Sequence, residues 1–273
     1  MTDGVQALTA TNNPWRMVAA LITGAVIGIL GGLIGLGGAE FRLPLLITVF
    51  AFVALEAVIV NKAISIIVVA SALVFRTKTI PVEILLQHWP IVVNLLAGSL
   101  IGAWVGADWA SRLAATTLYR VIAVLLVLIA LLLAFGHNPS VPTQPIAQGA
   151  ALIVLGALAG LVIGAIAALL GVAGGEFLIP TLVLVFGADI KVAGSLSLAV
   201  SLPTMLVSFA RYSRDRSFGV LRSHCGLVMA MAAGSIIGTY IGSRLLTWVP
   251  SALLIPVLVV ILVVSSIKVW RHR

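Results

Sequence analysis

The chain is a succession of long apolar segments separated by short polar ones. Uncharged runs of nearly membrane-spanning length extend over residues 17–39, 89–107, 192–210, 223–243 and 245–267. Each is close to the roughly 20 residues that an α-helix needs to cross the hydrocarbon core of a bilayer. Shorter apolar runs between them predict tilted or half-crossing helices. We therefore expect an all-α fold, a polytopic transmembrane bundle of 8 to 10 membrane segments.

Composition excludes several classes of protein. Hydrophobic residues make up 62% of the chain, charged residues 9%, and the mean hydropathy is +1.24, values that a soluble domain does not reach. The net charge of +8 comes from basic residues scattered among the loops, which argues against a nucleic-acid partner. The single cysteine, Cys225, cannot form an internal disulfide.

No motif in the chain predicts catalysis. The histidines lie apart near segment ends, and no nucleotide-binding, catalytic-triad or metal-ligand pattern occurs. We therefore expect a protein that is not an enzyme and that needs no cofactor and no metal.

An internal repeat relates the two halves of the chain at a spacing of 136 residues. Residues 24–50 placed over 160–186 without a gap are identical at 13 of 27 positions, including Glu40/Glu176 and Pro44/Pro180. The same offset brings the segment 97–102 (AGSLIG) onto 233–238 (AGSIIG). Apolar bias alone does not match Glu and Pro, so the repeat indicates a duplication.

Each copy divides into five apolar segments, and an odd number of crossings would invert the second copy. The first copy has segments near 17–39, 41–55, 58–75, 89–107 and 119–136, and the second near 150–175, 176–186, 191–210, 224–243 and 249–268. The predicted organisation is a cytoplasmic tail (1–16), a first transmembrane repeat (17–137), an external linker (138–149) and a second repeat with a short cytoplasmic tail (150–273). Ten crossings, or eight crossings plus hairpins, both fit the pattern.

The distribution of basic residues sets the expected orientation. With both ends of the chain in the cytoplasm, ten Lys and Arg residues lie inside and four, Arg76, Lys78, Lys191 and Arg244, lie outside. This asymmetry follows the positive-inside rule. It predicts a multi-pass protein of a bacterial inner membrane with cytoplasmic N- and C-termini.

Two glycine-rich breaks are the candidate binding elements. They are Gly35-Leu-Gly-Gly-Ala-Glu-Phe-Arg-Leu-Pro44 and Gly171-Val-Ala-Gly-Gly-Glu-Phe-Leu-Ile-Pro180. Glycine weakens a helix, and Pro is tolerated in the first turn of a new one, so each break predicts a helix end, a turn and a fresh start. Paired broken helices point to the substrate site of a transporter, because half-helix N-termini attract anions. A tight turn without a ligand is the alternative.

Charged and polar residues near the breaks complete the candidate site. Glu40 and Glu176 are either proton sites coupled to anion movement or carboxylates that satisfy the new helix. Arg42, replaced by Leu178 in the second copy, either binds the anion or neutralises Glu40. We expect Lys62 to face Glu56, Glu40 or a cavity. Predicted substrate-binding residues are Gly35, Gly37, Gly38, Ala39, Glu40, Arg42, Asn61, Lys62, Ser65, Gly171, Gly174, Gly175, Glu176, Ser197 and Ser201, with Glu40 and Glu176 as the proton-coupling pair.

Two further patterns have structural explanations. Asn61 with Ser65, and Ser197 with Ser201, share a helix face at i, i+4 spacing and either line a pathway or form interhelical hydrogen bonds. Glycine recurs every four residues at 98, 102 and 106 and again at 234, 238 and 242, which predicts helix faces for close packing.

At the glycine breaks, the chain resembles the TauE/SafE (sulfite exporter-like, TSUP) family of permeases, which carry a Gly-x-Gly-Gly-Gly run followed by an apolar stretch and Pro, twice. Further similarity lies in residues 187–197 and in the paired AGSxIG segments. The chain departs from the pattern at Ala39 and Ala173, each in place of a glycine, and at Glu40 and Glu176. The resemblance implies a permease for sulfur-containing or organic anions.

These observations predict a secondary transporter that moves a small anion, with proton coupling left open. Expected partners are the small anionic substrate and membrane lipid, and a homodimer is left open. A passive anion channel and a non-transporting scaffold or enzyme subunit are the alternatives.

Overall fold

The computed structural model describes residues 14–34, 38–76, 82–135, 145–188 and 190–245, together with residues 260, 263, 266, 267, 270 and 271. All regular structure in these ranges is helical, as expected for an all-α fold. The long helices are α2 (Pro14–Ile34), α4 (Ala54–Arg76), α6 (Trp89–Arg112), α7 (Ala115–Phe135), α8 (Ala150–Leu170), α10 (Ile190–Tyr212) and α12 (Cys225–Leu245). The short ones are α3 (Ala39–Thr48), α5 (Val82–Gln87), α9 (Gly175–Leu184), α11 (Val220–Ser223) and the 3-10 helix η1 (Arg216–Gly219).

The duplication seen in the sequence recurs in the helix boundaries. Four helices of the first half, α2, α3, α4 and α6, begin 136 residues before α8, α9, α10 and α12, respectively. The first three pairs also end in the same register. We call α2–α7 the first unit and the chain from α8 onward the second unit.

Glycines at every fourth residue allow the outer helices to pack closely in two equivalent pairs. A Cβ on Gly98, Gly102 or Gly106 of α6 would collide with the backbone of Ala157, Leu161 or Ala165 of α8. On α12, Gly234, Gly238 and Gly242 meet the backbone of α2 in the same way, at residues 21, 25 and 29. The predicted close-packing role of these glycines is confirmed. Because the residue numbers of the contacting positions increase in the same direction along both helices of a pair, the two helices run parallel.

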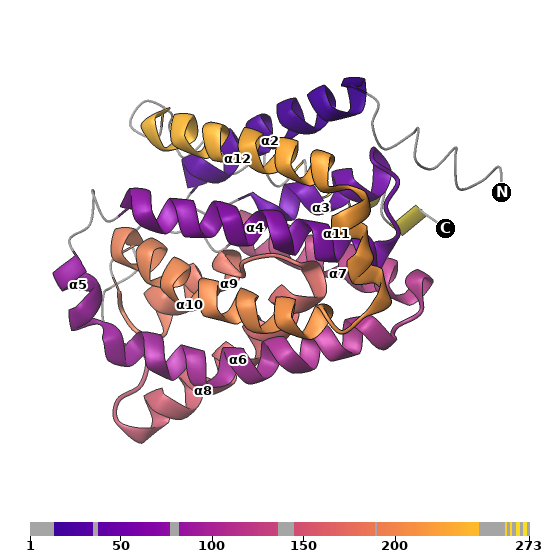
Figure 1. Ribbon diagram of the computed structural model, residues 1–273. Helices are drawn as coiled ribbons and strands as arrows, with labels where there is room; N and C mark the ends of the chain where they lie inside the picture. The colour runs from indigo at the N-terminus through magenta and orange to yellow at the C-terminus, as the bar shows by residue number, and fades with distance from the viewer. Residues whose placement is uncertain are drawn as a thin grey trace.

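Both pairs join the two units, since each combines the first long helix of one unit with the third long helix of the other. Figure 1 shows α2 beside α12 on one side of the molecule and α6 beside α8 on the opposite side, with α4 and α10 between them. The two central helices also contact one another. This arrangement places α4 and α10 where polar side chains are shielded from the surroundings.

The distribution of polarity is that of a membrane protein. Large aliphatic side chains are exposed on the outer helices, among them Val26 of α2, Val105 of α6 and Leu158 of α8. By contrast, Arg42 and Lys62 are fully buried. Six described helices are long and apolar enough to cross a membrane: α2, α4, α6, α8, α10 and α12. Shorter apolar stretches lie in α7 and α9.

Most predicted segments correspond to helices, with two differences in detail. Pro44 and Pro180 lie at the sixth residue of α3 and α9, beyond the first turn where the sequence suggested them. These helices begin earlier than expected, because Gly38 and Gly174 adopt left-handed conformations and each directly precedes the first residue of its helix. Most of the predicted segment 249–268 and most of the linker 138–149 lie outside the described residues.

The glycine contacts generate a test of the packing. Replacing Gly102 or its counterpart Gly238 with Ala should lower stability by roughly 1–3 kcal/mol, because each new Cβ meets backbone atoms that cannot yield without parting the helices. Thermal unfolding of the purified protein in detergent measures the change. Gly219→Ala is the matched control, since a Cβ there meets no atom within 4 Å. Equal melting temperatures for all three variants would contradict this packing.

Candidate functional site

At each described glycine break the chain doubles back on the preceding helix. Gly38 has a φ of 70°, and a Cβ there would lie 2.7 Å from the carbonyl oxygen of Ile27, seven residues before the end of α2. Gly174, with a φ of 82°, packs against Ile163 and Ala167 of α8. Left-handed backbone and close approach together require glycine at both positions. Of the predicted site residues, Gly35 and Gly37 lie outside the described residues.

Each new helix carries a buried glutamate in its first turn. The side chains of Glu40 and Glu176 are 1% and 3% exposed, and none of their four carboxyl oxygens has a hydrogen-bond partner among the described residues. Pro44 and Pro180 lack the N–H that would bond the backbone carbonyls of the same two glutamates. Each break therefore holds two buried carboxyl oxygens without a hydrogen-bond partner among the described residues.

Arg42 of α3 is the hub of a polar network in the first unit. Its Nη1 donates to Asn61 Oδ1 (3.3 Å) and Ser65 Oγ (3.1 Å) of α4, and its Nη2 donates to Ser235 Oγ (3.3 Å) of α12. The side chain is completely buried, and its Nε has no partner. Among the described residues, no carboxylate lies within ion-pair distance of this guanidinium. Arg42 thus contacts both members of the predicted polar pair, Asn61 and Ser65, directly.

Asn61 joins the two breaks to one another. Its Nδ2 donates to the carbonyl of Ala39, at the start of α3, at 3.0 Å and to that of Leu170, at the end of α8, at 3.4 Å. The interrupted helices of both units therefore meet at one side chain of α4.

Lys62 contacts backbone carbonyls rather than the acidic groups or cavity that the sequence suggested. Its Nζ donates to Ala167 O (2.9 Å), in the last turn of α8, and to Val172 O (2.8 Å), within the second break. Tyr212 of α10 adds a third bond to this helix end, from its hydroxyl to Ala168 O at 2.8 Å. The last turn of α8 carries negative partial charge on its free carbonyls, which explains the attraction of an ammonium group.

The second unit repeats the scaffold but not the cations. Leu178 stands at the position of Arg42, and Ser201, the counterpart of Ser65, has a buried hydroxyl without a partner. Ser197 bonds within its own helix, to Gly194 O at 2.9 Å. Ser99, the counterpart of Ser235, bonds Thr204 at 2.8 Å. The two predicted polar pairs therefore have different environments.

Sequence reasoning missed Ser235, Ser99 and Tyr212 as members of these networks. The serines lie in the paired AGSxIG segments, whose glycines had been assigned to packing alone. A polar residue repeated beside a packing glycine was the available signal for both serines. Tyr212 had none, because it follows the apolar part of α10 and its counterpart is Arg76.

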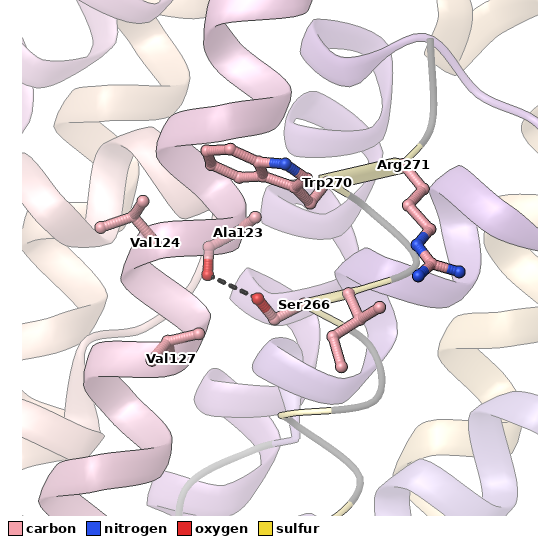
Figure 2. Close-up of a pocket in the computed structure, with 7 residues that line it drawn as sticks. Ala123, Val124, Val127, Ser266, Trp270 and Arg271 are labelled. Atoms are coloured by element: carbon pink, nitrogen blue, oxygen red, sulfur yellow. Dashed lines mark hydrogen bonds between the residues drawn. The ribbon is translucent and has the colours of Figure 1, made fainter.

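An apolar surface pocket lies apart from these residues. It has a volume of about 330 Å³ and is lined by Ala123, Val124, Val127, Ser266, Ile267, Trp270 and Arg271. Figure 2 shows the hydroxyl of Ser266 donating to the carbonyl of Ala123, a bond of 2.9 Å that ties α7 to the C-terminal part of the chain. None of the predicted site residues lines this pocket. No His, Cys, Asp or Glu cluster suited to a metal ion occurs within the described residues.

Comparison with known proteins gives one family. The sequence matches the family described as "Sulfite exporter TauE/SafE" over residues 20–269, which includes both units and both breaks. No curated protein and no solved structure matches the chain. With its repeated breaks and six membrane-length helices, the chain belongs to the TauE/SafE sulfite exporter family of membrane permeases.

Proposed function

We propose that the protein is a secondary transporter that carries a small, sulfur-containing or organic anion across a bacterial inner membrane. The observation that carries this proposal is Arg42, a guanidinium buried at the contact of α3, α4 and α12, with no carboxylate of the described residues within ion-pair distance. A buried cation is costly unless a counter-charge compensates it. A transported anion supplies that charge.

The donors of Arg42 suit an oxyanion. Three of its hydrogen bonds go to neutral acceptors, and Nε–H remains unpartnered on the edge that it shares with Nη2. This edge of a guanidinium binds two oxygens of a carboxylate or sulfonate side by side. Asn61 and the hydroxyls of Ser65 and Ser235 orient the arginine, and the start of α3 adds a positive helix end nearby.

We further propose that the two units are inverted in the membrane, with α2–α3 and α8–α9 as re-entrant hairpins. In support, the Arg16 side chain at the start of α2 donates to Phe50 O, beyond the end of α3, at 3.0 Å. In the second unit, Ile146 before α8 donates to Val185 O after α9 at 3.2 Å. α3 therefore runs antiparallel to α2 and returns to the side where α2 begins. From there α4 runs in the direction of α2, and α6 runs in the opposite direction. Because α8 runs parallel to α6, it points opposite to α2.

Glu40 and Glu176 are the proposed proton sites. A carboxyl group that lies buried without a donor is costly as an anion, whereas its neutral form is tolerated in an apolar setting. Alternating exposure of each break to water would let these groups take up and release a proton with each transport cycle. Since the two occupy equivalent positions in oppositely oriented units, one would serve each side of the membrane.

Substitution of Arg42 tests the anion site. Arg42→Leu, which copies the residue of the second unit, should reduce uptake of labelled sulfite and organosulfonates into proteoliposomes at least about 100-fold, the effect of losing a charge-assisted pair of roughly 3 kcal/mol. Arg42→Lys should retain part of the flux. Arg222→Leu, at an exposed position of α11, controls for the change in net charge. Wild-type flux in Arg42→Leu would exclude Arg42 from the site.

Glu40→Gln and Glu176→Gln, singly and together, test proton coupling. Amide groups keep the shape but cannot exchange a proton, so anion flux should lose its dependence on an imposed pH gradient while the melting temperature changes little. Glu83→Gln at an exposed site is the control. A lower melting temperature with unchanged pH dependence would instead assign both glutamates to helix stabilisation.

The single cysteine tests the inverted topology. Cys225 is exposed at the start of α12 and should react with a membrane-impermeant maleimide only from the cytoplasmic side. Gln87→Cys on a Cys225→Ser background marks the equivalent end of α6 and should react only from outside. Labelling of intact cells and of inside-out vesicles provides the comparison. Reaction of both positions from one side would show that the units are not inverted.

A further inference from the structure

We propose that the carbonyl oxygens at the second break form a binding site for an ammonium-type monovalent cation, and that Lys62 fills this site as a cation tethered to the chain. The Lys62 side chain is 1% exposed, and its Nζ lies 2.9 Å from Ala167 O and 2.8 Å from Val172 O. These two oxygens belong to α8 and to the turn that follows it. The ammonium group therefore bridges the interruption itself.

Neutral donors also reach this helix end, and one of them, the backbone N–H of Val172, donates to Ala167 O at 3.0 Å. Ala168 O accepts from Gly171 N (3.0 Å) and from the Tyr212 hydroxyl (2.8 Å), and Leu170 O accepts from Asn61. Among the described carbonyls of this helix end, those of Ala167 and Val172 are the two that accept from the Lys62 ammonium group. Unwound helix ends in transporters coordinate monovalent cations through backbone carbonyls of this kind.

The interaction depends on the cation and on no acidic residue. No carboxylate lies within ion-pair distance of Lys62 among the described residues, so carbonyl dipoles alone hold the ammonium group. Any cation of similar size that donates hydrogen bonds should be recognised in the same way. Leu198, at the position equivalent to Lys62 in the second unit, carries no charge. The contact between a lysine and the carbonyls of a break therefore occurs at the second break and has no equivalent from Leu198.

A consequence for transport rests on the proposed function. Because the chain itself supplies the cation, anion transport should require no dissolved sodium or potassium. The role of Lys62 is to position the second break, and Arg42 remains the group assigned to the anion.

Removal of the tether and replacement by a free amine test the site. Lys62→Ala deletes the side chain beyond Cβ and leaves a vacancy with the shape of n-propylammonium. The purified full-length variant should melt below the wild type, and n-propylammonium chloride should recover at least half of that loss while leaving the wild type unchanged. The neutral amine in equilibrium with it can enter the apolar interior.

Two additives distinguish a cation site from a simple cavity. n-Propanol has the shape without the charge, and tetramethylammonium has the charge without N–H donors, so neither should restore the melting temperature. Equal recovery with n-propanol would overturn the proposal, as would a Lys62→Ala protein as stable as the wild type. Absence of any recovery with n-propylammonium would overturn it too.

If Lys62→Ala cannot be purified, a second pair of variants tests whether position 62 requires a cation. Lys62→Arg keeps charge and donors and should yield folded protein, whereas the uncharged Lys62→Met should not. Equal yields of the two would contradict the proposal. Wild-type flux should also persist when N-methylglucamine replaces sodium and potassium on both sides. Loss of all flux with intact recovery of melting temperature would reject the transporter function and retain the cation site.

Discussion

A helix that is interrupted among apolar surroundings leaves backbone groups that only the protein can satisfy, and this constraint organises the centre of the molecule. At the end of α8 the donors are Lys62 and Asn61 of α4 and Tyr212 of α10. Asn61 also bonds the first residue of α3. The hydrocarbon core contains no water that could satisfy these backbone groups, so the side chains supply the hydrogen bonds instead. One turn of α4 thereby holds both breaks in place, and the position of Arg42 follows from it.

The scaffold is nearly symmetric, whereas its chemistry is not. Glycine contacts pair α2 with α12 and α6 with α8 at equivalent residues, and both breaks begin their new helix with a left-handed glycine and a buried glutamate. The buried cations Arg42 and Lys62, in contrast, both belong to the first unit, and their counterparts in the second unit are Leu178 and Leu198. Both copies of the duplicated unit therefore have the same helical scaffold, while the buried charges of Arg42 and Lys62 belong to the first copy. A single anion site at the junction of the units fits this division better than two equivalent sites.

The sequence predicted the helices, the repeat and the packing role of the glycines, because each of these depends on local periodicity or on residues a fixed distance apart. Helix ends near Gly171 followed from the same logic. The acceptors of Lys62 and the bond from Arg42 to Ser235 could not be predicted, since they join residues about 105 and 193 positions apart across two units. The expectation that Lys62 faces Glu56, Glu40 or a cavity also neglected the carbonyls that a helix end offers. Repetition of Ser99 and Ser235 beside packing glycines was the signal that went unused.

The central claim is that a transported anion provides the missing counter-charge of Arg42. A structure of the purified protein soaked with selenite, located through the anomalous scattering of selenium, tests it most directly. The account predicts a selenium peak within hydrogen-bond distance of the free Nε of Arg42, among α3, α4 and α12. Peaks confined to the exposed basic residues at the surface, with none beside Arg42, would contradict it.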